Sequence, residues 1–202
     1  ADHGVSSGLI LTFLRHLPVA DAELAYDAAV ATGVDLLGVG LCSTEVGFAA
    51  APFGTLFARA RADGLHTVAH AGEEGDASYV WEVLDSLGVE RVDHGINAMG
   101  DRRLVEHLAE HEIPLTVCPL SNVRLKAVPT LADHPLPAML DAGLVACVNS
   151  DDPAYFGGYL DANVTAVEQE FGLSADQVET LAANSIRASF LPEAEKTRLL
   201  HG

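Results

Sequence analysis

Short apolar runs alternate along the chain with segments of helical periodicity, and most of the helical segments end in glycine. This alternation is typical of a parallel β/α layer, because each strand needs a crossover helix to return the chain to the same edge of the sheet. The apolar runs are nearly continuous, so we expect both faces of the sheet to be covered. The predicted strands are 9–14, 36–41, 67–70, 91–94, 115–118 and 145–149.

Asp or Pro marks the expected first turn of each helix between these strands. After the sixth strand the chain is expected to be helical to its end, and Ser174 with Gln177 fits a capping box for a helix over 175–190. The intervening helices are predicted to begin near Asp21, Pro52, Asp76, Asp101 and Pro135.

Two α/β architectures fit this pattern: an open doubly wound sheet and part of a (β/α)₈ barrel. A complete barrel typically needs about 250 residues. The chain has 202 residues, and six β/α units without an initiator Met favour a barrel that has lost its start. Residues 1–202 are expected to form one domain, since no linker, repeat or low-complexity tract divides them.

Charge and composition narrow the possible partners. The chain has 11 Lys and Arg against 29 Asp and Glu, a formal net charge of -18, which would repel nucleic acid and anionic lipid. We find neither an apolar run long enough to span a membrane nor an export signal, so we expect a cytoplasmic protein. The cysteines, Cys42, Cys118 and Cys147, lie in apolar runs and are interpreted as buried thiols.

Polar and ionisable residues cluster where four consecutive predicted strands end, which is the edge where parallel α/β folds bind ligands. Buried strands seldom end in several charged groups by chance, because each unpaired buried charge costs several kcal/mol. Imidazole and carboxylate together are the ligands of a hydrolytic zinc ion or a similar divalent cation. The four strand ends are His70-Ala-Gly-Glu73, Asp93-His94-Gly95, Pro119-Leu-Ser-Asn122 and Asn149-Ser-Asp151-Asp152-Pro153.

These four motifs, in this order and at these spacings, resemble the adenosine/adenine deaminase family. The resemblance extends from about Gly4 to Ala188 and implies a (β/α)₈ barrel of which this chain supplies strands three to eight and the C-terminal helices. The family's first strand ends in His-x-His, which this sequence lacks, so a longer natural chain is expected. Asp93, Ser121 and 154–159 resemble the adenine deaminase branch of the family more than the adenosine branch.

The resemblance implies a role for each site residue. His70 and Asp151 are implied as ligands of one Zn²⁺, Glu73 as the acid that protonates N1 of a purine, and His94 as the group that orients the attacking hydroxide. Asp152 is implied to hydrogen-bond N7. Further implied substrate contacts are Gly72, Asp93 and Ser43; the alternatives are a pairing of Asp93 with Arg91 and a structural role for Ser43 and Glu45.

Residues outside these motifs are interpreted as structural. Tyr79 and Trp81 follow the Glu73 loop on a predicted helix and are expected to pack. The remaining histidines are expected in loops or helices, exposed to solvent: His3, His16, His66, His107, His111, His134 and His201.

The implied function is zinc-dependent hydrolytic deamination of adenine to hypoxanthine and ammonia, with a small purine as partner and a possible homo-oligomer. Deamination of adenosine or of another 6-aminopurine nucleoside is the nearest enzymatic alternative. An alternative of another class is a non-catalytic, truncated barrel fragment that associates through its open edge strands.

Overall fold

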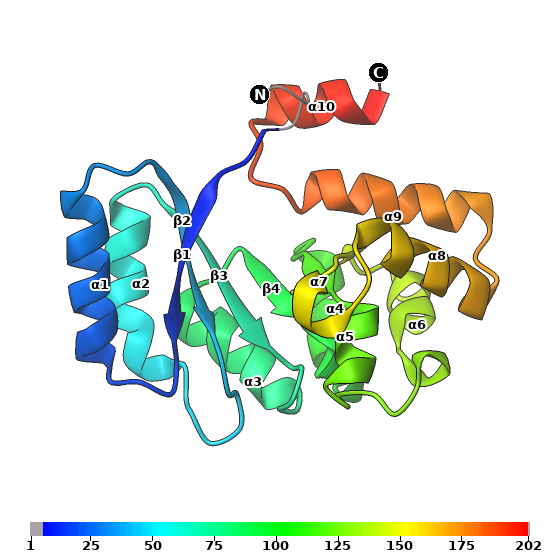
Figure 1. Ribbon diagram of the computed structural model, residues 1–202, viewed down its shortest axis with the longest axis horizontal. Coiled ribbons are helices and arrows are strands. Elements are labelled where there is room, and N and C mark those ends of the chain that lie inside the picture. The colour runs from blue at the N-terminus through cyan, green and yellow to red at the C-terminus, as the bar shows by residue number, and fades with distance from the viewer. Residues whose placement is uncertain (1–5, 202) are drawn as a thin grey trace.

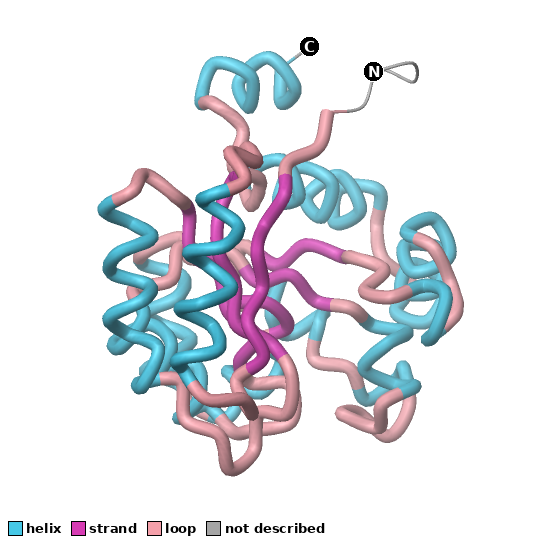
Figure 2. Tube along the Cα trace, turned by 60° about the vertical axis from the view of Figure 1, so that its left-hand side comes forward, coloured by secondary structure: helices cyan, strands magenta, loops and turns pink. Residues whose placement is uncertain are grey.

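The computed structural model describes residues 6–201 and contains one six-stranded parallel sheet. Its strands lie side by side in the order in which they occur along the chain. Figure 2 shows them running through the middle of the molecule with helices around them. The strands are β1 (Leu9–Leu14), β2 (Leu36–Cys42), β3 (His66–Ala71), β4 (Arg91–His94), β5 (Leu115–Val117) and β6 (Ala146–Val148).

This strand order decides between the two predicted architectures. A doubly wound sheet reverses direction at a switch point, as in the order 3-2-1-4-5-6, whereas strands of a (β/α)₈ barrel follow one another around the axis. The observed order β1-β2-β3-β4-β5-β6 has no reversal and confirms the barrel prediction. Figure 1 shows α1 and α2 side by side next to β1 and β2, with α8 and α9 at the opposite end of the sheet.

Local signals set the helix starts largely as predicted. The Asp76 carboxylate accepts from the backbone N–H of Ser78 at 2.9 Å, and Ser174 with Gln177 forms the predicted capping box. The last long helix ends at Arg187 instead of 190. The α-helices are α1 (Val19–Ala31), α2 (Gly54–Ala62), α3 (Ala77–Glu82), α4 (Arg102–Glu110), α5 (Pro119–Arg124), α6 (Leu136–Asp141), α7 (Pro153–Phe156), α8 (Leu160–Phe171), α9 (Ala175–Arg187) and α10 (Glu193–His201).

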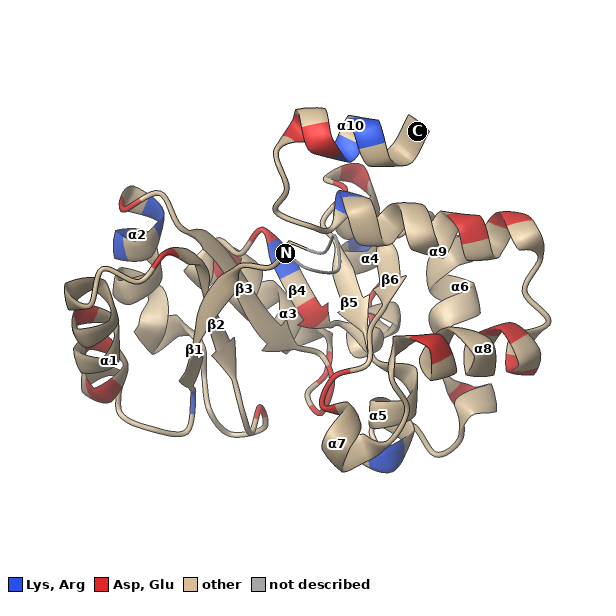
Figure 3. Ribbon diagram, turned by 45° about the horizontal axis from the view of Figure 1, so that its top comes forward, with Lys and Arg blue, Asp and Glu red and all other residues tan. Residues whose placement is uncertain are grey.

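Short 3₁₀ and π turns complete the chain: η1 (Ala51–Phe53), η2 (Val83–Leu87), η3 (Ile96–Gly100) and η4 (Leu131–Asp133). One hydrophobic cluster fills the space between sheet and helices, and the exposed fractions of Tyr26, Phe57 and Leu108 within it are 0%. Asp and Glu residues lie on α1, α8 and α9 and in the loop before α7 (Figure 3). Within residues 6–201, no helix combines the length and hydropathy that a membrane span requires.

Two of the histidine predictions are wrong. His66 belongs to β3, where its ring stacks on Phe190 with centroids 4.1 Å apart. His134 is only 2% exposed, because η4 and α6 bring it into the protein interior. His3 lies outside the described residues. All three cysteines are free, and Cys42 is only half-buried, unlike Cys118 and Cys147.

Candidate active site

Six of the predicted site residues line one cavity of about 300 Å³ at the carboxyl ends of the strands. They come from four separate strand ends, so the barrel order brings together side chains that are far apart in the sequence. The six residues are Ser43, His70, Glu73, His94, Asp151 and Asp152. A smaller adjoining cavity of about 260 Å³ is also lined by His70, His94 and Asp151, together with Asp93.

Three of the five non-glycine residues with positive φ in residues 6–201 line this cavity. Ser43, His94 and Asp151 have φ angles of 78°, 67° and 56°, in the left-handed region that non-glycine residues rarely adopt. Such conformations cost about 1–3 kcal/mol each and persist where the surrounding structure enforces them, commonly at functional sites. Three strand ends are therefore turned sharply so that their side chains meet at one place.

His70 lies in a strongly negative environment. Its Nδ1 lies 3.4 Å from Asp93 Oδ2 and is a buried atom without a hydrogen-bond partner. Burial opposes protonation of the ring, but the nearby carboxylates, Asp93 first and then Glu73 and Asp151, outweigh it and raise the pKa of His70. The negative electrostatic potential around His70 therefore favours the binding of a cation.

Glu73 has the properties of a proton donor at neutral pH. Burial raises the pKa of its carboxyl group to about 7, although His70 and the hydrogen bond from Asn122 oppose the shift. Asn122 Nδ2 donates to Glu73 Oε1 at 2.7 Å, and Oε2 lies 3.4 Å from His94 Nε2. A carboxyl group with a pKa near the working pH can both give and take a proton.

His94 is buried at 3% exposure and remains neutral. Burial, and then the positive charge of a protonated His70, lowers its pKa to about 4. Asn122 Nδ2 lies 3.3 Å from His94 Nδ1, so one amide group contacts both His94 and Glu73. Asn122 ends the Pro119–Asn122 motif but is not among the predicted site residues; its place in that motif is the only sequence signal for this role.

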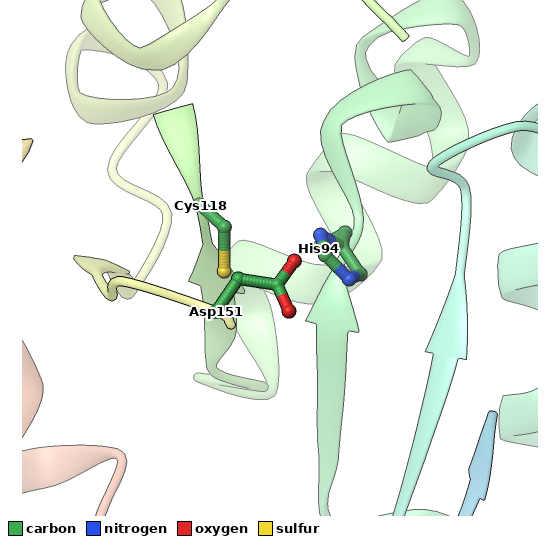
Figure 4. Close-up of side chains that lie close together, drawn as sticks. All are labelled: His94, Cys118 and Asp151. Carbon is green, nitrogen blue, oxygen red and sulfur yellow. The ribbon is translucent and has the colours of Figure 1, made fainter. Parts of the chain in front are cut away.

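The Asp151 carboxylate points toward His94 (Figure 4). Its Oδ2 accepts a hydrogen bond from Ser121 Oγ at 2.7 Å. Potential ligand atoms of His94, Cys118 and Asp151 all lie within 4.8 Å of one another. Burial raises the pKa of the Cys118 thiol, which favours the protonated form over the thiolate that binds metals.

Two buried charges hold the backbone that carries Glu73. Glu45 is 3% exposed, and its carboxylate accepts from four consecutive backbone N–H groups, those of residues 72–75. Arg15, also 3% exposed, donates from its guanidinium to the carbonyl oxygen of His70. The ends of β1 and β2 therefore fix the segment after β3, which supports the structural role expected for Glu45.

The other predicted substrate contacts occupy different environments. Gly72 donates its N–H to Glu45 and has a φ of 68°, and a Cβ there would meet Val80 Cγ2 at 2.6 Å. Asp93 Oδ1 is 2.8 Å from Thr116 Oγ1 and 3.3 Å from Arg91 Nε, so the pairing with Arg91 is confirmed. Burial would raise the pKa of Asp93, but the contacts with His70 and Arg91 outweigh it and hold the pKa well below its usual range.

The sequence matches the family described as adenosine deaminase over residues 1–202. It is 55% identical over 197 residues to an adenine deaminase of Streptomyces coelicolor, covering 98% of this chain and 58% of the relative. An adenine deaminase of Sphingopyxis alaskensis is also 55% identical, over 200 residues that cover 99% of this chain and 59% of that protein. The chain thus spans about three fifths of the length of these curated relatives.

Solved structures give a consistent result. The crystal structure of adenine deaminase from Arthrobacter aurescens superposes with a TM-score of 0.96 at 53% identity, covering 98% of this chain and 61% of that one. An amidohydrolase from Burkholderia ambifaria with bound Zn has a TM-score of 0.90 at 27% identity, over 98% of this chain and 56% of that one.

Proposed function

Since this chain belongs to the adenosine deaminase family, we propose that it supplies most of the active site of an enzyme that converts adenine hydrolytically to hypoxanthine and ammonia. Relatives that are 55% identical to it carry the name adenine deaminase, which favours the free base over a nucleoside as substrate. The described residues share one hydrophobic cluster, which supports a single domain.

The metal that we propose for this site is zinc, held in part by His70 and Asp151. Both side chains line the same two cavities, and imidazole and carboxylate are ligand types that zinc accepts. The unpartnered Nδ1 of His70 and the surrounding carboxylates indicate a site suited to a cation. When bound, zinc supplies a water whose pKa is lowered toward about 7.

Glu73 is proposed to give a proton to ring N1 of the purine. Addition of water at C6 disrupts the aromatic ring, and protonation of N1 makes that carbon more electrophilic. With a pKa of about 7, Glu73 is partly protonated at neutral pH, which suits this task. Asn122, bound to Oε1, leaves Oε2 as the oxygen available for the proton.

The remaining cavity residues would orient the substrate. We propose that Asp152 accepts a hydrogen bond from N7–H of adenine, and that neutral His94 orients the attacking water. Leu125 and Phe156 also line the cavity and add apolar surface for a flat heterocycle. Substrate contacts also remain predicted for Gly72, Asp93 and Ser43.

The observation that carries this proposal is the convergence of His70, Glu73, His94 and Asp151 on one cavity. The test is turnover of adenine and of adenosine by the complete zinc-loaded enzyme, followed by the change in ultraviolet absorbance and by ammonia release. We expect the higher kcat/KM with adenine. A higher kcat/KM with adenosine would overturn the substrate, and no ammonia from either compound would overturn the activity.

A further inference from the structure

His134 forms the start of a buried hydrogen-bond chain that ends at the catalytic cavity. Its Nδ1 accepts from the backbone N–H of Leu136 at 3.1 Å, and its Nε2 lies 3.2 Å from Asn122 Oδ1. A backbone N–H can only donate, so Nδ1 must be the unprotonated nitrogen of the ring. In the neutral ring the proton is then on Nε2, directed at Asn122.

The Nε2–H of His134 fixes the orientation of the Asn122 amide, because one end of an amide accepts hydrogen bonds and the other donates them. Its oxygen accepts from His134, so its nitrogen faces the cavity with two N–H groups. One N–H donates to Glu73 Oε1 at 2.7 Å and the other reaches His94 Nδ1 at 3.3 Å. Both N–H groups and the oxygen of this fully buried amide side chain therefore have partners.

The tautomer of His94 follows from the same rule. An amide nitrogen cannot accept, so His94 Nδ1 must be an unprotonated acceptor, and the ring proton resides on Nε2. Nε2 lies 3.4 Å from Glu73 Oε2, beside the group proposed to carry the catalytic proton. Each ring accepts a hydrogen bond at Nδ1 and so carries its single proton on Nε2, and burial also lowers the pKa of His134 to about 4.

We propose that His134 and Asn122 are positioning residues that hold His94 as its Nε2–H tautomer, so that His94 meets the attacking water as a hydrogen-bond donor and not as a proton acceptor. This inference rests on the proposed function for its kinetic consequence. It also explains why a histidine outside the cavity is buried with both nitrogens bonded.

The test compares two substitutions of His134 in the complete zinc-loaded enzyme. His134→Phe keeps a ring but removes the Nε2–H donor, and we expect kcat to fall about 10–100-fold with little change in KM, as for other outer-shell partners. His134→Gln restores an N–H near the position of Nε2 and should recover most of kcat. The matched control is His111→Gln, an exposed histidine after α4, which should match the wild type.

A second measurement reads the tautomer directly. Nitrogen-15 NMR of the histidine-labelled enzyme, with His94 assigned by its loss in His94→Gln, should show protonation at Nε2 in the wild type. A mixture of tautomers is expected in His134→Phe. This reading needs no turnover, so it tests the hydrogen-bond chain even if the enzyme proves inactive on adenine.

Each result decides one question. Wild-type kcat in both His134 variants, or His94 protonated at Nδ1, would overturn the positioning role while leaving the deaminase function standing. If His134→Phe fails to fold, His134→Gln and the wild-type spectrum decide. A structural role alone would reduce the amount of active enzyme without changing kcat per active site, and would leave the His94 tautomer unchanged.

Discussion

His66 and His70 stand at opposite ends of strand β3, and their surroundings differ in every respect that matters for chemistry. His66 Nδ1 pairs with Glu90 at 2.8 Å, and its ring stacks on Phe190. His70 has a buried Nδ1 without a hydrogen-bond partner and lies among the carboxylates of Asp93, Glu73 and Asp151. One strand thus presents a satisfied histidine at its amino end and an unsatisfied one at its carboxyl end.

The same difference extends along both edges of the sheet. At the amino edge, the Arg91 guanidinium lies 4.8 Å from the centroid of the Phe190 ring, and His66 pairs with Glu90. At the carboxyl edge, Ser43, His94 and Asp151 have strained backbones, and Arg15 has buried guanidinium nitrogens without partners. The unmet hydrogen bonds at the carboxyl edge, together with the three strained residues around one cavity, indicate groups arranged for a ligand.

The largest expected effect comes from removing the proposed metal ligand on the last strand. Asp151→Ala should lose bound zinc and reduce adenine turnover to background, because zinc needs three or four ligands for tight binding. Metal analysis by mass spectrometry and an ammonia assay measure both. Glu90→Gln, at the amino edge, should keep both; full zinc content in Asp151→Ala would remove Asp151 from the metal site.

Glu73→Gln should separate metal binding from chemistry. The amide cannot deliver a proton to N1, so we expect kcat to fall about 10²–10⁴-fold with zinc retained. Steady-state kinetics and metal content check this, again with Glu90→Gln as the matched control. A near-normal rate would exclude Glu73 as the acid.

Glu45→Gln tests how strongly activity depends on the hydrogen bonds by which Glu45 holds the backbone of residues 72–75. The carboxylate accepts from the N–H groups of residues 72–75, and the amide would oppose them with a donor. We expect kcat to fall about 10–100-fold. Glu82→Gln is the control, since Glu82 accepts one exposed backbone N–H, from Ala51; equal effects of the two variants would contradict an anchoring role.

The raised pKa of Glu73 also predicts a pH-dependent stability. The pKa rises from an ordinary 4.5 to about 7 in the folded state, so folding favours the neutral form, and stability is lost as pH rises through about 7. Gln does not ionise. In metal-free protein, Glu73→Gln should therefore gain on the order of 3 kcal/mol over wild type at pH 8, at about 1.4 kcal/mol per pH unit.

This gain in stability should largely disappear at about pH 4.5 and below, because Glu73 in the folded wild type is then as neutral as the Gln of the variant. Urea unfolding at the two pH values measures the difference. An equal gain at both would assign it to packing and not to ionisation.

The smallest expected effect comes from His66→Ala, which changes the amino edge of the sheet and not the carboxyl edge. The ion pair with Glu90 is exposed, and such pairs contribute about 0–1 kcal/mol. We expect a loss of stability of that order, measured by thermal unfolding, and unchanged kcat. A large loss of activity would contradict the claim that only the carboxyl end of β3 takes part in the proposed chemistry.

Much of the fold could be predicted from the sequence because its signals are local. The strand Leu9–Leu14 and the strand Arg91–His94 match the predicted ranges, and Asp76 and Asp101 cap helices as expected. The sequence does not predict the short helix α5, because Pro119–Arg124 follows β5 almost directly and the first-turn N–H of Leu120 is bonded by Asn163, far along the chain.

The site was harder to predict, because its second layer has no local pattern. Motif order predicts that His70, Glu73 and Asp151 lie together, and all three line one cavity. The burial of His134 has no such signal, because it depends on α6 and η4, which bring the ring to Asn122. Similarly, the four backbone bonds to Glu45 join residues about thirty positions apart in the sequence. Only the folded chain shows that His134 and Glu45 contact the residues and backbone around the cavity.

The most direct test is an anomalous difference map, measured at the zinc edge, from crystals of the complete enzyme grown with zinc. We predict one peak with the His70 imidazole and the Asp151 carboxylate both at about 2.0–2.2 Å. A peak bound instead by His94, Cys118 and Asp151, or a peak away from the carboxyl ends of β3 and β6, would contradict the proposed site.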